Sequence, residues 1–221
     1  RTGADANDGL AATQQGDSGP LATIMEAVRK CDPGSLITIA NTGLDYREGV
    51  NIEGFKKGLA ERPLVINGNG CTVNGLVVVA AERWTKLKDD IYWFENRLPN
   101  GKFGIMPHSN WLASWKHQGW FDHELAPNIF FVDGRPAPHV KSLEQIPPGG
   151  YFYDTLAEPR RIYFRLPAGM TKLEEVKTEF PLNLGVYISD DYVVVRNLRS
   201  IYSADDGFAG FWGVGVVFQN I

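Results

Sequence analysis

Two short stretches decide the fold: Tyr192-Val-Val-Val-Arg-Asn-Leu198 and Gly215-Val-Val-Phe-Gln-Asn-Ile221. They align at an offset of 23 residues, and they share identical residues at Val193/Val216, Val194/Val217 and Asn197/Asn220. A repeat in the twenties is typical of a β solenoid, because no single coil can bury its own apolar face. Asparagine at one fixed place in each coil is expected to form a stack of side-chain amides. Two copies also fit a second interpretation, two edge strands of a sandwich.

The stretch upstream of residue 83 combines one helical pattern with short β-type runs. Leu21, Ile24, Met25 and Val28 recur at helical spacing after Pro20, and Asp32-Pro33-Gly34 ends the pattern, so we expect a helix over residues 20–31. The β-type runs are bounded by Gly, Asn or Asp, as is typical of a turn-rich fold, and comprise residues 36–40, 49–52, 63–66 and 76–80.

The middle of the chain has a different composition. Five of the six tryptophans and all four histidines lie between positions 84 and 139. Longer aromatic strand-like segments occur here, at residues 91–94, 128–132, 151–154 and 161–166. We therefore predict three parts: residues 1–83 as an N-terminal cap with the first coils, residues 84–180 as an inserted antiparallel β subdomain, and residues 181–221 as continuing coils.

Composition limits the class of protein. The 221 residues are 43% hydrophobic and 22% charged, which is typical of a soluble domain with a core of its own. The net charge of −4 leaves no basic footprint for nucleic acid, and no apolar run is long enough to predict a membrane span. Cys31 and Cys71 are expected to be two separate thiols, although a disulfide between them stays open. The chain ends in a strand-like segment, so we expect it to be a piece of a longer protein.

Several motifs together resemble a known superfamily. They are Asp5-Ala-Asn-Asp-Gly9, Gly19-Pro-Leu-Ala-Thr-Ile24, Tyr46-Arg-Glu48 and Glu61-Arg-Pro-Leu-Val-Ile66. In this order they resemble the N-terminal region of right-handed parallel β-helix proteins of the pectate-lyase-like superfamily. The resemblance implies an all-β fold, a right-handed parallel β-helix whose open end is capped by a short N-terminal helix.

The inserted part narrows the implied function. Phe131-Val-Asp-Gly134, residues 148–154 and residues 162–169 are similar to the extra β-sandwich of some β-helix glycoside hydrolases. The resemblance implies a secreted or periplasmic carbohydrate-active protein, foremost a glycoside hydrolase acting on a polysaccharide or oligosaccharide, with a glycan as partner and no cofactor. A polysaccharide lyase acting on uronate-containing glycans is the second interpretation. A non-catalytic adhesin, tailspike or glycan-binding protein is the third.

Two acidic pairs are candidates for chemistry. Glycoside hydrolysis needs two carboxyl groups on either side of one bond. The catalytic candidates are Asp205 and Asp206, which lie between the two repeat copies; an Asp-Gly turn is the alternative. Asp190-Asp191 is interpreted as a plain turn. In the family, the catalytic carboxylates usually lie on coils beyond those present here.

Tryptophans supply the binding candidates. Trp111, Trp115, Trp120 and Trp212 offer apolar faces on which a sugar ring can stack, although a subdomain core is the alternative for the first three. The segment from His117 to Glu124 gathers His, Asp and Glu, but its spacing fits no zinc site, so no metal is expected. It is interpreted as a loop or the edge of a cleft.

Overall fold

A computed structural model describes residues 3–16, 18–95, 130–154, 157, 161–181, 183–203 and 206–221. Strands dominate, and helix α1 (Ile24–Lys30) is the one α-helix in these ranges, so the predicted all-β class is confirmed. The chain divides into two compact units. Unit 1 comprises residues 1–75 and 184–221, and unit 2 comprises residues 76–183.

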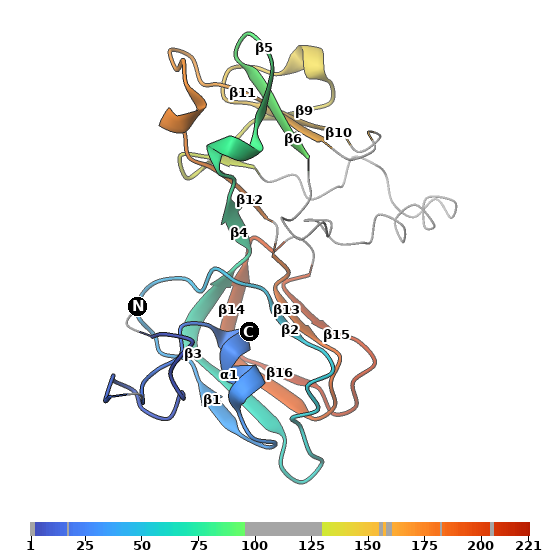
Figure 1. Ribbon diagram of the computed structural model, residues 1–221. Coiled ribbons are helices and arrows are strands. Elements are labelled where there is room, and N and C mark those ends of the chain that lie inside the picture. Colours follow the sequence, from blue (N-terminus) through green and yellow to red (C-terminus); the bar gives the residue numbers. More distant parts are fainter. Residues whose placement is uncertain are drawn as a thin grey trace. The chain divides into compact units, whose positions relative to one another are not determined.

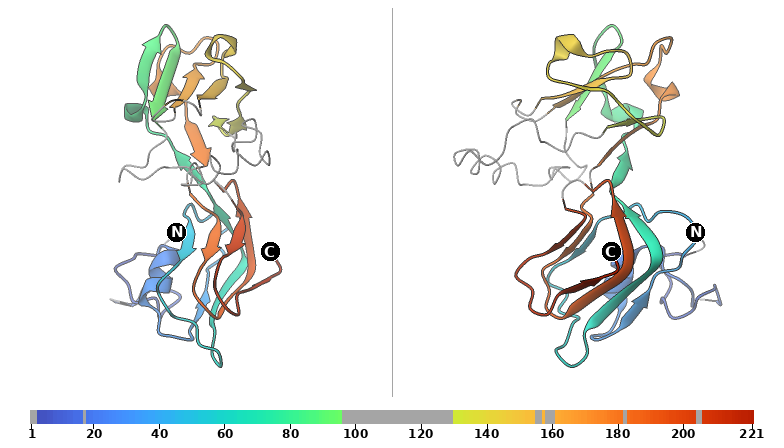
Figure 2. Two further views of the ribbon diagram at one scale, coloured as in Figure 1. Left: turned by 90° about the vertical axis from the view of Figure 1, so that its right-hand side faces the viewer. Right: turned by 180° about the vertical axis from the view of Figure 1, so that it is seen from behind.

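Unit 1 contains two sheets in which every strand pairs in parallel with its neighbour. One sheet has the order β1-β3-β14-β16 and is formed by Leu36–Thr38, Leu64–Asn74, Val193–Ile201 and Val217–Gln219. The other has the order β2-β13-β15 and is formed by Val50–Ile52, Val186–Ile188 and Phe208–Gly210. Successive strands of the unit alternate between the two sheets, so segments far apart in sequence lie side by side (Figures 1 and 2).

The sequence repeat sets the register of β14 and β16. Val194 lies opposite Val217 in a parallel pair, which is the offset of 23 residues that the repeat predicted. Asn220 Nδ2 donates to Asn197 Oδ1 at 3.1 Å, and Asn197 Nδ2 donates to Asn67 Oδ1 at 2.9 Å. The predicted stack of side-chain amides is therefore confirmed, and Asn67 extends it to a third strand. Parallel pairing excludes the antiparallel arrangement of edge strands for this pair.

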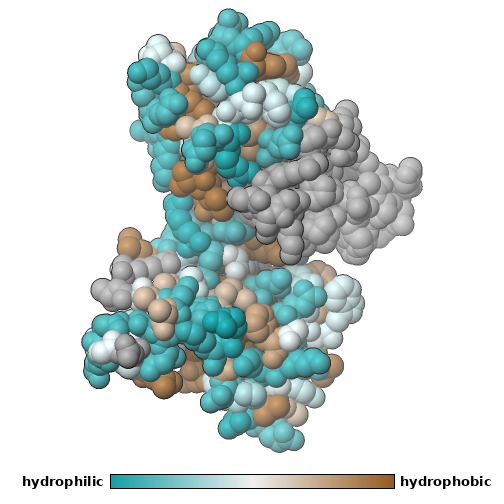
Figure 3. Space-filling model, viewed as in Figure 1, coloured by the Kyte–Doolittle hydropathy of each residue, from teal (hydrophilic) through white to brown (hydrophobic). Residues whose placement is uncertain are grey.

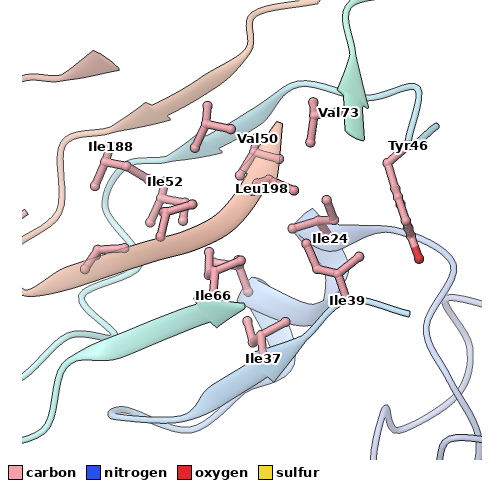
Figure 4. Close-up of a cluster of buried hydrophobic side chains, with 14 of the residues drawn as sticks. Ile24, Ile37, Ile39, Tyr46, Val50, Ile52, Ile66, Val73, Ile188 and Leu198 are labelled. Carbon is pink, nitrogen blue, oxygen red and sulfur yellow. The ribbon is translucent and has the colours of Figure 1, made fainter. Parts of the chain in front are cut away.

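The core of unit 1 lies between its two parallel sheets and is aliphatic (Figure 4). Strand residues alternate between buried and more exposed positions, as in Val50-Asn51-Ile52 and Val186-Tyr187-Ile188. This period of two directs one side of each strand inward. The residues Val50, Ile52, Leu64, Ile66, Val73, Ile188, Val193, Val195 and Leu198 are fully buried there.

Helix α1 begins later than the sequence pattern predicted. The start near Pro20 was wrong, because Thr23 caps the helix and its Oγ1 accepts a hydrogen bond from Glu26 N at 3.2 Å. The Glu48 carboxylate accepts from the backbone N–H groups of Ile24 and Met25. These acceptors satisfy N–H groups that have no partner within the first helical turn. Ile24 and Val28 are buried in the core of unit 1.

Strand β4 (Leu76–Val78) forms within the β-type run predicted at residues 76–80, but it does not belong to the first coils expected within residues 1–83. It pairs antiparallel with β12 (Thr178–Pro181), and so it belongs to unit 2 instead of the parallel stack. The chain leaves unit 1 at Gly75, whose N–H donates to Ile201 O at the end of β14. Strand β3 continues to Asn74, well past the expected end at Ile66, because it pairs with β14 along that length.

Unit 2 contains two further sheets. The first has the order β5-β6-β11-β10-β9 and is formed by Thr85–Lys88, Ile91–Glu95, Arg161–Arg165, Tyr151–Asp154 and His139–Val140. The second has the order β4-β12-β7-β8, in which β7 is Phe131–Val132 and β8 is Arg135–Pro136. All pairs are antiparallel except β9 with β10, which is parallel. Short 3-10 helices occupy Ala81–Arg83, Leu143–Gln145 and Leu173–Glu175.

Unit 2 has an aromatic core of its own. The Trp84 ring lies 4.6 Å from that of Phe94 in an edge-on arrangement, and Trp84 Nε1 donates to Thr178 Oγ1 at 3.3 Å. Phe94, Phe130, Phe164 and Phe180 are fully buried in this core. Edge-to-face ring pairs of this kind stabilise a core beyond their buried area.

No disulfide joins Cys31 and Cys71; Cys71 is buried and Cys31 is half-buried. The two-thiol interpretation is therefore correct, except that Cys31 is less buried than expected. Within the described ranges, no helix is both long and apolar enough to cross a membrane.

The amide stack predicts a stability difference between two substitutions of Asn197, whose φ of 54° lies in the left-handed region. Asn197→Gly tolerates this φ but removes both amide hydrogen bonds, which is expected to lower the free energy of unfolding of unit 1 by about 1–2 kcal/mol. Asn197→Ala should cost about 1 kcal/mol more, since alanine is strained at positive φ. Native-state hydrogen exchange at the Val195 amide measures the loss of unfolding free energy in both variants. Asn51→Ala, at an exposed strand position, is the control, and equal effects of all three substitutions would contradict the stack.

Candidate functional site

The turn that follows β15 presents a tryptophan to solvent. Trp212 is 87% exposed and has a φ of 58°. Gly213 N donates to Phe211 O across it at 2.8 Å, so three residues form a γ-turn with positive φ at the tryptophan. Such turns are rare and strained, and a bulky residue at positive φ is unusual. The local backbone is therefore held in a costly conformation that leaves the indole ring in water.

Three aromatic rings gather at this turn and are called here the aromatic platform: Tyr187, Phe211 and Trp212. The Tyr187 and Phe211 rings are stacked, with centroids 5.5 Å apart and planes 25° apart. The Phe211 and Trp212 centroids are 5.9 Å apart. Tyr187 reaches this surface because its neighbours Val186 and Ile188 point into the core.

A polar side chain lies beside the platform. Asn51 of β2 is exposed and stands opposite Tyr187 in the parallel pair of β2 with β13. Its amide offers both a donor and an acceptor next to an apolar ring face. Most of the surface drawn in Figure 3 is hydrophilic, and apolar residues show on it only in small groups. Ligand sites commonly combine aromatic rings, which contact an apolar face of the ligand, with a polar group that fixes the orientation of the ligand. The three rings and the adjacent amide offer this combination.

Two aspartates hold the turns around the platform. The buried Asp190 carboxylate accepts from Gly54 N at 2.6 Å and from Lys56 N at 2.7 Å, which ties it to the turn after β2. Asp191 Oδ1 accepts from Val214 N at 2.7 Å, just after the platform turn. The interpretation of this pair as a turn is therefore incomplete, because the two carboxylates also hold the segments that follow β2 and β15.

Gly213 shows how closely these turns pack. A side-chain Cβ at this position would lie 2.6 Å from Asp190 O, closer than real contacts allow. Only glycine fits between the platform turn and the backbone of Asp190. The position of Trp212 is thus set by its two neighbours in sequence. On one side the Phe211 N–H donates to Ile188 O, and on the other side Gly213 packs against the backbone of Asp190.

The structure locates only some of the predicted site residues. Trp212 lies in the platform. Asp206 is exposed just before β15, whereas Asp205 lies outside the described residues. Trp111, Trp115 and Trp120 also lie outside them, as does the segment 117–124. Within the described ranges, no three His, Cys, Asp or Glu side chains gather as a metal site.

Sequence reasoning missed Tyr187 and Phe211. A signal for Phe211 was present, since Phe211-Trp212 stands between Gly210 and Gly213, a pattern that favours a turn, and turns generally lie at the surface. No local signal distinguished Tyr187 from the other strand tyrosines. Its neighbour in space, Phe211, is 24 residues away and meets it only through the pairing of β13 with β15.

No protein-family model matches the chain, and no curated protein is significantly similar to it. Among solved structures, the one described as "The complex structure of XylC with xylose" is similar, with a TM-score of 0.51 and 14% sequence identity. The similarity covers 93% of this chain and 35% of that chain. At this identity the likeness concerns the fold, and this chain spans about a third of the length of the protein it matches.

The hydrogen bonds of the two aspartates predict a graded loss of stability. Asp190→Ala leaves the backbone N–H groups of Gly54 and Lys56 without their acceptor and should lower the free energy of unfolding by about 2 kcal/mol, because two hydrogen bonds to a buried carboxylate are lost. Asp191→Ala removes one hydrogen bond at an exposed site and should cost about 1 kcal/mol. Asp206→Ala, also exposed, is the matched control and should change stability by less than about 0.5 kcal/mol. Urea unfolding followed by circular dichroism measures the series, and an Asp190→Ala protein as stable as the control would refute this role.

Proposed function

We propose that this chain is part of a secreted carbohydrate-active protein and that unit 1 is a right-handed parallel β-helix which binds a glycan on the aromatic platform. The fold proposal is supported by the parallel pairing, by the alternation of strands between two sheets and by the amide stack. The likeness to XylC supports it too, because it extends over both units. That XylC was solved with xylose supports a sugar as the ligand class.

The exposure of Trp212 carries the binding proposal. An indole ring that is 87% exposed gives up the hydrophobic stabilisation that burial would provide. A single exposed apolar residue needs no explanation, but this one has a strained backbone and two further rings beside it. Strain of this kind is concentrated at ligand sites, where the surrounding structure enforces it.

A sugar ring fits the chemistry of the platform. Its C–H face is apolar and stacks on an aromatic face, while its hydroxyl groups stay in water or bind to polar neighbours. Asn51 offers such a neighbour beside Tyr187. Because the three rings follow one another over two coils, the platform has room for more than one sugar unit, which favours a chain over a monosaccharide.

Hydrolysis is the activity that we propose for the whole protein, with a lyase as the alternative. Hydrolysis needs two carboxyl groups flanking the glycosidic bond, and of the predicted pair the structure describes only Asp206. The partner carboxyl is proposed to come from another coil of the protein. A non-catalytic binding protein would need only the aromatic platform. A hydrolase and a non-catalytic protein would therefore share this binding site, and only the hydrolase would release cleaved products.

The platform predicts that Trp212→Ala weakens binding to a neutral polysaccharide such as xylan by about tenfold, through loss of one stacking surface. Unfolding should be unchanged, since the ring is in water. Leu10→Ala is the matched control, because Leu10 is also 87% exposed and lies far from the platform in sequence. Affinity electrophoresis in xylan gels measures the binding. Equal mobility of the two variants and the unsubstituted chain would overturn the platform.

The products of xylan and polygalacturonate digestion test the activity of the full-length protein. We expect new reducing ends without the ultraviolet absorbance of unsaturated sugars, as hydrolysis requires. Absorbing products would overturn hydrolysis in favour of a lyase. Binding without any cleavage would overturn both in favour of the non-catalytic class.

A further inference from the structure

Unit 2 contains an open recess of about 610 Å³, a volume within the range of small-molecule sites. It lies where the β5–β6 hairpin, the 3-10 helix Leu143–Gln145 and the end of β11 meet. Its lining combines apolar and charged residues: Lys88, Asp89, Asp90, Ile91, Leu143, Glu144, Ile146 and Arg165. No residue of the aromatic platform belongs to it, and none of its residues is among the site residues predicted from the sequence.

An ion pair at the recess is held in a fixed orientation. Arg165 Nε donates to Asp90 Oδ2 at 2.9 Å, and Arg165 Nη1 donates to Ile146 O at 3.4 Å. Both side chains keep more than a third of their surface exposed, at 38% for Arg165 and 36% for Asp90. The backbone on either side is anchored as well, because Leu166 N donates to Asp90 O at 2.9 Å. The guanidinium plane is thus oriented before any ligand arrives.

Each partner of this pair keeps unused hydrogen-bonding capacity. Within the described part of the chain, Arg165 Nη2 makes no hydrogen bond, and Asp90 Oδ1 accepts none. A pair of N–H donors therefore stands beside a carboxylate acceptor at the recess. A ligand that uses both must itself accept and donate at neighbouring atoms, as two adjacent hydroxyl groups do.

The remaining lining residues exclude a strongly charged ligand. Lys88 and Arg165 are cationic, whereas Asp89, Asp90 and Glu144 are anionic. The pKa of Glu144 is held below its ordinary value by hydrogen bonds from its own backbone N–H and the Ser142 hydroxyl and by the nearby Lys88 charge. An anion would meet three carboxylates, and a cation would meet two fixed positive charges. The apolar Ile91, Leu143 and Ile146 supply a surface for C–H groups.

We infer that this recess binds one neutral sugar unit, with adjacent hydroxyl groups bridging Arg165 and Asp90 and the C–H face against the apolar residues. The site is separate from the aromatic platform and goes beyond the function proposed for it. It gives unit 2 a sugar-binding role of its own, directed at a monosaccharide or at the end of a glycan chain.

The Arg165 side chain provides a direct test by NMR of the full chain. Its Nε–H signal, assigned by its loss in Arg165→Lys, is followed while D-xylose, D-glucose, D-glucuronate or D-glucosamine is added. The neutral sugars are expected to shift this signal saturably in the millimolar range, and the two charged sugars to act more weakly. Asp90→Asn should weaken the binding by about tenfold, since it removes one charged hydrogen bond.

Two further variants keep the test decisive. Asp32→Asn makes the same chemical change at an exposed site of unit 1 and should leave the titration unaltered. If Asp90→Asn loses its dispersed spectrum, Glu144→Gln, at an exposed position of the recess, takes its place. The proposed site would be overturned by any of three outcomes. These are the absence of a saturable shift, a shift caused by the charged sugars alone, and an affinity of the recess variant equal to that of the unsubstituted chain. Since xylan binding through Trp212 is measured separately, either proposal can fail without the other.

Discussion

The parallel pairing of β3 with β14 is the interaction on which the rest of unit 1 depends. It joins Leu64–Asn74 to Val193–Ile201 along nearly their whole length, across the entire sequence of unit 2. Parallel strands cannot be connected by a tight turn, so some long connection between them is obligatory. Here a second folded unit serves as that connection. Strand β16 pairs in parallel with the other edge of β14, and in the second sheet β15 pairs in the same way with β13.

The pairing of β3 with β14 contains one irregularity, a shift of register. The register shifts between Arg196 and Leu198, where Asn197 stands opposite the Gly68-Asn69-Gly70 bend. A Cβ on Gly68 would lie 2.5 Å from Asn197 O, so the two backbones approach as closely as glycine permits. Asn69, Asn197 and Asn220 all have positive φ, a conformation that asparagine tolerates better than other side chains. Asparagine thus serves both the bend in the backbone and the amide stack.

The aromatic platform follows from the same stacking. Asp190 and Asp191 are adjacent in sequence, yet one binds the segment after β2 and the other the segment after β15, the two strands on either side of β13. Two neighbouring carboxylates therefore link three turns, which holds the strained conformation at Trp212. A candidate site on a turn is normally loose, and this one is stiffened by charge-assisted hydrogen bonds to the Asp190 and Asp191 carboxylates.

Local patterns in the sequence were sufficient for the all-β class, for the offset of β14 and β16 and for the asparagine stack, because each rests on the period of a strand or on a repeat. They also predicted Trp212 as a binding residue, and the structure leaves this side chain exposed. The start of α1 was predicted too early although Thr23, its N-cap, is a local signal; only the additional acceptor Glu48, more than twenty residues away, lies beyond a local pattern. Residues 76–80 were predicted correctly as a β-type run, but their placement among the first coils was wrong, because the partner of β4 is β12, about a hundred residues later.

The arrangement of side chains at both sites was decided only by the tertiary structure. Tyr187 meets Phe211 through strand pairing, and Arg165 meets Asp90 across a folded unit. Neither pair has a spacing that helical or strand periodicity could reveal. Sequence patterns report which face of an element is apolar, since burial of that face is a local property of the strand. Which two exposed groups come together depends on non-local pairing, and that is specified by the packing of the whole unit.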